Sequence, residues 1–299
     1  MSDELSRRRF LQLGLVGAGT TRMVTRKIPR TGEELPVIGL GTWQTFDVGD
    51  GAAERSPLGS VLRTFFAAGG RLIDSSPMYG RAESVVGELL AGSPPLASPG
   101  VSPFLATKVW TSGRTRGEEQ MRTSMERMRT KKMDLMQIHN LVDWRTQLGT
   151  LRAWKAAGKI RYLGVTHYQL DAFDDLESII KKEKVDFVQL PYSIAVRKAE
   201  ERLLPAAAEQ GTAVIVMRPF EGGSLLRDVR GKPLPPWAAE IDCTSWAQVF
   251  LKFILGHPAV TCPIPATSKP EHIADNILAG VGRMPDEPLR RKMVQHLGL

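Results

Sequence analysis

The stretch "IRYLGVTHYQLDAFDDLESIIKK", residues 160–182, holds one complete unit of the pattern that decides the fold. Residues 160–167 form a short, mostly apolar run of the kind found in buried strands. Residues 170–182 show the apolar spacing of an amphipathic helix. A buried strand followed by a helix is the repeating unit of parallel sheets that helices cover.

The same unit recurs along the chain in both directions. We expect eight strands, over residues 36–41, 71–74, 103–110, 133–139, 160–167, 185–193, 212–220 and 259–265. A helix follows each of them, the first ending at residue 70 and the others covering 82–92, 117–128, 148–159, 170–182, 199–211, 244–258 and 270–280. Eight such units without a domain-sized linker favour an α/β fold of the (β/α)8 TIM barrel type. An open doubly wound sheet is disfavoured because no G-x-G-x-x-G motif opens a helix after the first strand.

Shorter signals refine this architecture. Residues 23–38 can form a hairpin across the base of the barrel, with its turn at Thr31. Residues 221–242 are long for a barrel loop, and long loops often cover ligands. Thr244 is a candidate N-cap, and Pro205 interrupts an otherwise helical segment.

The composition excludes several classes of protein. The chain has 299 residues, of which 42% are hydrophobic and 24% charged, as in soluble globular proteins that need no disulfide or metal for stability. Its two cysteines, Cys243 and Cys262, form no metal-binding motif, so we expect no metal site and two reduced, buried thiols.

The net charge of +8 is concentrated at the start of the chain. Seven bases and two acids lie in residues 1–30, which therefore carry +5 and leave +3 for the rest. A nearly balanced body argues against nucleic-acid binding.

Residues 6–19, "SRRRFLQLGLVGAG", resemble a bacterial twin-arginine export signal, with a basic start and a short apolar run. The run is shorter than the about 20 apolar residues that span a bilayer stably. We therefore expect a leader over residues 1–24, disordered or helical, and a barrel domain over residues 25–299. The export machinery would then be a partner and the periplasm the destination. The alternative is a basic tail on a cytoplasmic protein.

Four polar residues lie where neighbouring strands of the predicted barrel end. Asp74, Lys108 and His139 end three successive strands, and Tyr79 follows Asp74 in the same loop. The C-terminal ends of barrel strands carry the active site in this fold, so the four side chains can converge. Each alone has an ordinary explanation, such as a helix-capping Asp or a solvated Lys; their joint placement suggests catalysis.

These four residues fit acid catalysis. A tyrosine has an ordinary pKa of about 10, and a nearby lysine cation lowers it. An aspartate holds that lysine charged and in place, while a histidine can donate a hydrogen bond to a substrate oxygen. Such a set makes a tuned proton donor for a carbonyl group that is being reduced.

Seven segments, in this order, resemble the aldo-keto reductase family. They are "GLGTW" (39–43), "IDSSPMYG" (73–80), "ATKVW" (106–110), "MDLMQIHN" (133–140), "GKIRYLGVTHY" (158–168), "VQLPYS" (188–193) and "IPATSKPEHIADN" (264–276). The resemblance covers residues 25 to about 285. It implies a barrel without a Rossmann domain that binds NADP(H) across its C-terminal face, with Tyr79 as the general acid.

The resemblance also implies a set of cofactor-binding residues. They are Gly41, Thr42, Thr166, His167, Gln189, Met217, Arg218, Thr267, Ser268, Lys269, His272 and Asn276. Gln189 matches the residue that binds the nicotinamide carboxamide, and Asn276 matches the adenine contact. The cationic Lys269 in the 2′-phosphate region favours NADPH over NADH.

Four positions depart from the usual family pattern. Thr166 and His167 stand where the family has Ser-Asn, and Met217 stands where the family has a tyrosine that stacks on the nicotinamide. His272 stands where the family often has an arginine. Methionine can pack on a ring face without an aromatic plane.

The resemblance therefore implies a monomeric, NADPH-dependent reductase of small aldehydes or ketones. Trp43 and Trp110 are candidates for the substrate pocket, although both can serve as packing residues. A non-catalytic NADP(H)-binding regulatory protein of the same fold is the main alternative, and a barrel lyase or hydrolase is a second.

Overall fold

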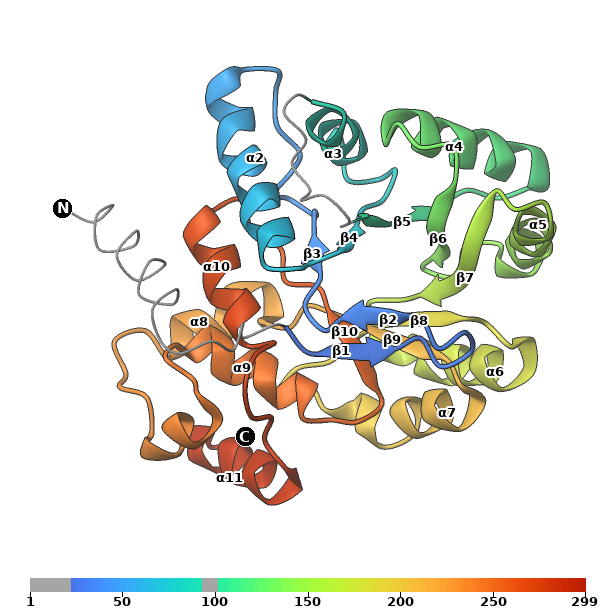
Figure 1. Cartoon of the computed structure of the whole chain (residues 1–299). Helices are drawn as coiled ribbons and strands as arrows, with labels where there is room; N and C mark the ends of the chain where they lie inside the picture. The colour runs from blue at the N-terminus through green and yellow to red at the C-terminus, as the bar shows by residue number, and fades with distance from the viewer. Residues whose placement is uncertain (1–22, 93–101) are drawn as a thin grey trace.

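The computed structural model describes residues 23–92 and 102–299. Eight parallel strands form one sheet in the order β10-β9-β8-β7-β6-β5-β4-β3. The strands are β3 (Leu40–Gly41), β4 (Leu72–Asp74), β5 (Phe104–Val109), β6 (Met133–His139), β7 (Ile160–Thr166), β8 (Phe187–Pro191), β9 (Ala213–Met217) and β10 (Val260–Pro263). Helices lie around this curled sheet (Figure 1), and the predicted (β/α)8 fold is confirmed.

Two glycines let the first strand meet the last. The amide nitrogens of Gly39 and Gly41 donate to the carbonyl oxygens of Pro263 and Pro265 at 3.0 and 3.1 Å, and a parallel bridge joins Gly41 to Ala266. A Cβ atom at Gly41 would lie 2.8 Å from the carbonyl oxygen of Ile264, which is too close for any side chain. Glycine is therefore required here for the sheet to close.

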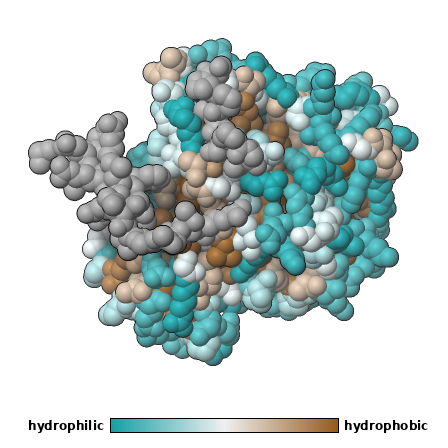
Figure 2. Space-filling view, viewed as in Figure 1, coloured by the Kyte–Doolittle hydropathy of each residue, from teal (hydrophilic) through white to brown (hydrophobic). Residues whose placement is uncertain are grey.

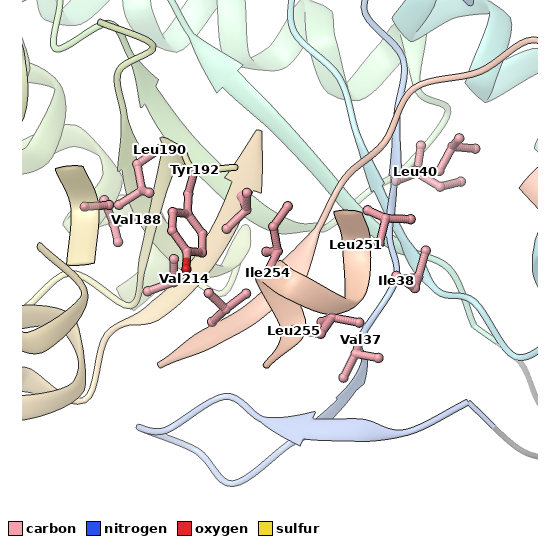
Figure 3. Close-up of a cluster of buried hydrophobic side chains, with 14 of the residues drawn as sticks. Val37, Ile38, Leu40, Val188, Leu190, Tyr192, Val214, Leu251, Ile254 and Leu255 are labelled. Atoms are coloured by element: carbon pink, nitrogen blue, oxygen red, sulfur yellow. The ribbon is translucent and has the colours of Figure 1, made fainter. Parts of the chain in front are cut away.

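Ten α-helices occur in the described residues, and most of them cover the outside of the sheet and bury its outward-facing side chains. They are α2 (Ala52–Ala67), α3 (Ala82–Leu90), α4 (Arg114–Arg127), α5 (Trp144–Ala156), α6 (Phe173–Glu183), α7 (Leu203–Gln210), α8 (Ser224–Asp228), α9 (Trp246–Leu255), α10 (Pro270–Leu278) and α11 (Glu287–Leu297). Figure 3 shows Leu251, Ile254 and Leu255 of α9 among strand residues such as Val188 and Val214. Hydrophilic residues cover the outer side of the helices around α4 and α5 (Figure 2).

The interior of the barrel has a second apolar core. It is formed by Ile28, Leu35, Leu72, Phe104, Ala106, Leu135, Tyr162, Phe187, Ala213, Ile215, Cys262 and Ile264. Within a strand these residues stand two apart, as the period of a β-strand requires. Polar residues take over the same inward positions near the C-terminal ends of the strands, which is where a site can form.

The predicted hairpin closes the base of the barrel. The strands β1 (Thr25–Lys27) and β2 (Glu34–Pro36) pair in antiparallel fashion. Below the interior core, the Tyr162 hydroxyl donates to Glu33 at 2.7 Å, and Arg161 forms ion pairs with Glu33 and Asp134. These contacts close the base of the barrel, and we call the other end, where the strands finish, the open end.

Local details differ from the sequence-based expectation. The segment 199–211 is not one helix: a 3-10 turn, Lys198–Glu200, precedes α7, so that Pro205 lies in the first helical turn, where a missing N–H costs little. The N-cap of α9 is Ser245 rather than Thr244, and its hydroxyl accepts from the Gln248 amide at 3.1 Å. The terminal helix α11 was not predicted.

The segment after β9 is partly helical instead of a free loop. It contains the 3-10 turns Glu221–Gly223 and Pro236–Ile241 on either side of α8. Trp237 is buried, and the buried Lys252 ammonium donates to the carbonyl oxygen of Ile241 at 2.6 Å. The segment is thereby attached to α9.

Both cysteines are free and buried, as predicted. The twin-arginine-like leader lies outside the described residues except for Met23 and Val24, so export stays a prediction. In the described part of the chain, the helices are all too short or too polar to cross a bilayer.

Candidate active site

A buried ion pair lies at the C-terminal ends of β4 and β5. The Lys108 ammonium donates to Asp74 Oδ2 at 2.6 Å and to the carbonyl oxygen of Ser75 at 2.7 Å. The side chains of Asp74 and Lys108 are only 2% and 1% exposed. Removing two charges from water is costly unless they are paired and hydrogen-bonded, so this geometry keeps the lysine charged at a defined point.

Tyr79 and His139 lie against this pair, so the structure brings all four predicted residues together. The Lys108 ammonium is 5.0 Å from the centroid of the Tyr79 ring. The rings of Tyr79 and His139 meet edge to face with their centroids 6.0 Å apart. The Trp110 ring lies 6.4 Å from that of His139.

The pKa values of Tyr79 and Lys108 are both raised. Burial raises the pKa of Tyr79, and the Lys108 charge offsets only part of that effect. The expected lowering of this pKa by Lys108 is present, but burial outweighs it, so the pKa of Tyr79 is raised overall. Burial alone would lower the pKa of Lys108, but the Asp74 carboxylate and the Tyr79 phenol raise it above its ordinary value. At neutral pH the phenol keeps its proton and the ammonium its charge.

His139 is held as a neutral imidazole. Burial, together with the charge of Lys108, lowers its pKa to about 3. Its Nδ1 lies 3.0 Å from the hydroxyl of Ser76, which also accepts the amide hydrogen of Met78 at 3.3 Å. The hydroxyl is then free to donate its own hydrogen to Nδ1, which leaves the imidazole proton on Nε2. This proton can be donated to a substrate oxygen.

The low pKa of His139 predicts acid sensitivity. Between about pH 6.5 and about pH 3, the unfolded chain binds a proton at this histidine that the folded chain does not. The free energy of unfolding should therefore fall as the pH decreases, by on the order of 2 kcal/mol between pH 7 and pH 5 from this residue alone. Urea unfolding of the unaltered protein and of His139→Gln, each at pH 7 and at pH 5, measures this decrease in the free energy of unfolding. An equal pH slope in the two proteins would contradict the assignment.

Two buried oxygens at the ends of β7 and β8 lack a hydrogen-bond partner within the described residues. They are Thr166 Oγ1 and Gln189 Oε1, and the two residues are direct neighbours in the strand register. Gln189 Nε2 donates to Asp74 Oδ2 at 3.3 Å. Buried polar atoms without partners are rare, and this adjacent pair fits a ligand carboxamide, which offers both a donor and an acceptor.

The remaining residues of the predicted cofactor set line the same end of the barrel. Thr42 follows β3, and its hydroxyl donates to the carbonyl oxygen of Asp74 at 3.0 Å. His167 and Arg218 follow β7 and β9 directly, and Met217 ends β9. No hydrogen bond joins Met217 or Arg218 to the four central residues in the part of the chain that the structure describes.

The residues predicted to bind the 2′-phosphate surround the start of α10. Lys269 is the N-cap of this helix, and its amide donates to the Thr267 hydroxyl at 3.0 Å. Ser268 and His272 are exposed, whereas Asn276 is buried. A helix N-terminus with a nearby lysine suits a phosphate group.

Exposed apolar side chains follow several strands at the open end, and we call this set the apolar mouth. Large hydrophobic side chains are exposed at seven places in the described residues, and five of these lie in the loops after β3, β4, β5 and β7. The five are Trp43, Met78, Trp110, Tyr168 and Leu170. Trp43 and Trp110 were predicted from the sequence and are 52% and 42% exposed. Their placement favours contact with a ligand over packing in the core.

Two residues whose side chains contact the central four were missed. Ser76 orients His139, and Gln137 Nε2 donates to Asp74 Oδ1 at 3.1 Å. A polar residue at an inward position of the strand "MDLMQIH" is a signal that could have pointed to Gln137. No group of three metal-ligating side chains occurs among residues 23–92 and 102–299.

The model of the aldo/keto reductase family matches residues 37–291. This chain belongs to that family. It is therefore an NAD(P)H-dependent oxidoreductase.

Individual relatives of this aldo-keto reductase are distant. Methylglyoxal reductase YeaE of Escherichia coli is 28% identical over 249 residues, which cover 81% of this chain and 84% of the relative. The NADH-specific methylglyoxal reductase of Escherichia coli is 27% identical over 239 residues, with coverages of 67% and 69%. An aldo-keto reductase from Klebsiella pneumoniae, solved in complex with NADPH, has the same fold, with a TM-score of 0.75, 24% identity and coverages of 92% and 96%.

Proposed function

We propose that this aldo-keto reductase reduces an aldehyde or ketone to an alcohol with NADPH. The observation that carries the proposal is the Tyr79 phenol, protonated at neutral pH, beside a buried Lys108–Asp74 ion pair at the open end of the barrel. A general acid must hold its proton before the reaction and must be able to release it during the reaction.

Each side chain of the site has a separate role in this reaction. Bound NADPH supplies the hydride for the carbonyl carbon. His139 donates its Nε2 hydrogen to the carbonyl oxygen and orients it. Tyr79 transfers its proton to that oxygen as negative charge develops, and the Lys108 ammonium stabilises the phenolate that remains. Asp74 keeps the ammonium in place.

The residues present fit the cofactor. Gln189 Oε1 and Thr166 Oγ1 can bind the nicotinamide carboxamide with their unpartnered oxygens. Lys269 at the start of α10 can bind the 2′-phosphate, which NADH lacks. We therefore infer a preference for NADPH, as in the Klebsiella pneumoniae complex, although one relative is named as NADH-specific.

The apolar mouth favours substrates with an apolar body. Aromatic side chains such as Trp43, Trp110 and Tyr168 offer large contact areas to aromatic or aliphatic groups. The E. coli relatives are named for methylglyoxal, which is a small dicarbonyl with little apolar surface. We expect the present enzyme to reduce a naphthaldehyde with a higher kcat/KM than methylglyoxal.

Turnover and binding assays test this function. Carbonyl-dependent loss of NADPH absorbance is expected with the purified full chain, and tryptophan quenching should show NADPH binding about tenfold more tightly than NADH. Binding of NADPH without turnover of any carbonyl would support the non-catalytic, regulatory alternative. The absence of NADPH binding would overturn the proposal in favour of a different barrel enzyme.

A further inference from the structure

The carboxylate of Asp74 is held by three donors from three different strands. Oδ2 accepts from the Lys108 ammonium at 2.6 Å and from Gln189 Nε2 at 3.3 Å. Oδ1 accepts from Gln137 Nε2 at 3.1 Å, and the described residues provide no other partner for this oxygen. Gln137 therefore holds the second carboxylate oxygen, and together with the donors to Oδ2 it fixes the rotation of the carboxylate about its Cβ–Cγ bond.

The structure makes room for Gln137 inside the barrel. Gln137 is fully buried in β6, two residues before His139, so both side chains face inward. Its partner in the strand register is Gly164 of β7. A Cβ atom at Gly164 would lie 3.2 Å from Cγ of Gln137 and 2.9 Å from the carbonyl oxygen of Phe187. A larger residue at position 164 would crowd the glutamine.

The amide of Gln137 has one unfavourable feature. A carboxylate can only accept hydrogen bonds, so the amide must turn its nitrogen toward Asp74. Its oxygen, Oε1, is then buried without a partner in the described part of the chain. A methionine or leucine would fill the same space without this cost. The donor toward Asp74 is the feature of the side chain that neither replacement provides.

We propose that Gln137 is a positioning residue that orients the Asp74 carboxylate so that Oδ2 stays against Lys108. In this role Gln137 acts through the ion pair and takes no part in the proton transfer itself. The proposal rests on the reductase function proposed above. Other titratable groups near this carboxylate are Tyr79 in the loop after β4, His139 on β6 and Cys262 on β10.

Two substitutions at Gln137 separate positioning from packing. Gln137→Met removes the donor at similar volume, and kcat should fall about ten- to a hundredfold at every pH with little change in KM or in NADPH affinity. Gln137→Glu restores a donor only when its carboxyl is protonated. Beside a buried carboxylate this occurs well above the ordinary glutamate pKa of about 4.3. The kcat of Gln137→Glu should therefore rise relative to that of Gln137→Met as the pH is lowered from 8 to 6.

A matched control is available in the outer layer of the barrel. Gln248 of α9 is also buried, and it also donates to a carboxylate, at 2.6 Å from Asp275. Gln248→Met should lower the urea midpoint while keeping the pH profile of the unaltered enzyme. Equal kcat values for Gln137→Met and the unaltered enzyme would overturn the proposal. So would a Gln137→Glu variant that stays as impaired as Gln137→Met at every pH.

A second measurement tests the contact without turnover. The shifts in urea midpoint caused by Gln137→Met and Asp74→Ala should not add up in the double variant, because each substitution alone removes the same hydrogen bond between Gln137 and Asp74. Additive shifts would contradict the positioning role even if the protein reduced no carbonyl. An unaltered protein that lacks turnover but shows this coupling would count against the reductase function alone.

Discussion

Replacing Tyr79 by phenylalanine is expected to lower kcat by about a hundred- to ten-thousandfold, the usual contribution of a positioned general acid. The phenyl ring keeps the contacts of Tyr79 with the apolar core and its edge-to-face contact with His139. Only the proton donor is lost. The affinity for NADPH should therefore stay within about twofold, since the hydroxyl is aimed at the substrate oxygen in the proposed mechanism.

A second tyrosine provides the control for this experiment. Tyr162 is buried at the opposite end of the barrel, where its hydroxyl donates to Glu33 and lies 2.9 Å from the Thr31 hydroxyl. Tyr162→Phe should lose about 1 kcal/mol of unfolding free energy and retain its turnover. Steady-state kinetics measure kcat for both variants, and tryptophan quenching measures their affinity for NADPH. Full activity in Tyr79→Phe would end the proposed mechanism.

Replacing Lys108 by methionine should affect both stability and catalysis. The methionine fills a similar space, but the Asp74 carboxylate is then buried without a counter-charge. Breaking a buried pair by removing one partner typically costs about 3–5 kcal/mol of unfolding free energy. In addition, nothing stabilises the Tyr79 phenolate, so kcat should fall by several orders of magnitude.

A double variant distinguishes the two effects. Asp74→Asn combined with Lys108→Met removes both charges and should recover much of the lost stability, because replacing an entire buried pair is often nearly neutral. Its turnover should stay as low as that of Lys108→Met. Urea unfolding and steady-state kinetics of Asp74→Asn, Lys108→Met and the double variant measure the stability and the turnover separately. A double variant no more stable than Lys108→Met would contradict the account of the ion pair.

The arrangement of elements could be predicted because it follows from local pattern. Each strand is a short apolar run and each following helix has an apolar stripe, so the order of the eight units is visible in the chain itself. Barrel topology then brings the C-terminal ends of all strands to one rim. This is why Asp74, Lys108 and His139 could be grouped before any coordinate was known.

Some local structure could not be predicted in this way. Pro205 reads as an interruption of a helix, and only the actual start of α7 shows that it lies in the first turn. The helix α11 has a low apolar content and is held by tertiary contacts, such as the 2.6 Å hydrogen bond from Arg290 to the Tyr192 hydroxyl. Tertiary packing determines where such helices form, because their intrinsic helix propensity is weak.

The sequence by itself determined the barrel, the family and the four residues at the strand ends, because each depends on the order and spacing of residues. The tertiary structure alone decided how these residues are tuned. Whether Tyr79 has a raised or a lowered pKa depends on the balance between burial and the charge of Lys108, and burial is a property of the whole fold. The same holds for Gln137, whose role became visible only when β6 placed its amide 3.1 Å from the carboxylate of Asp74.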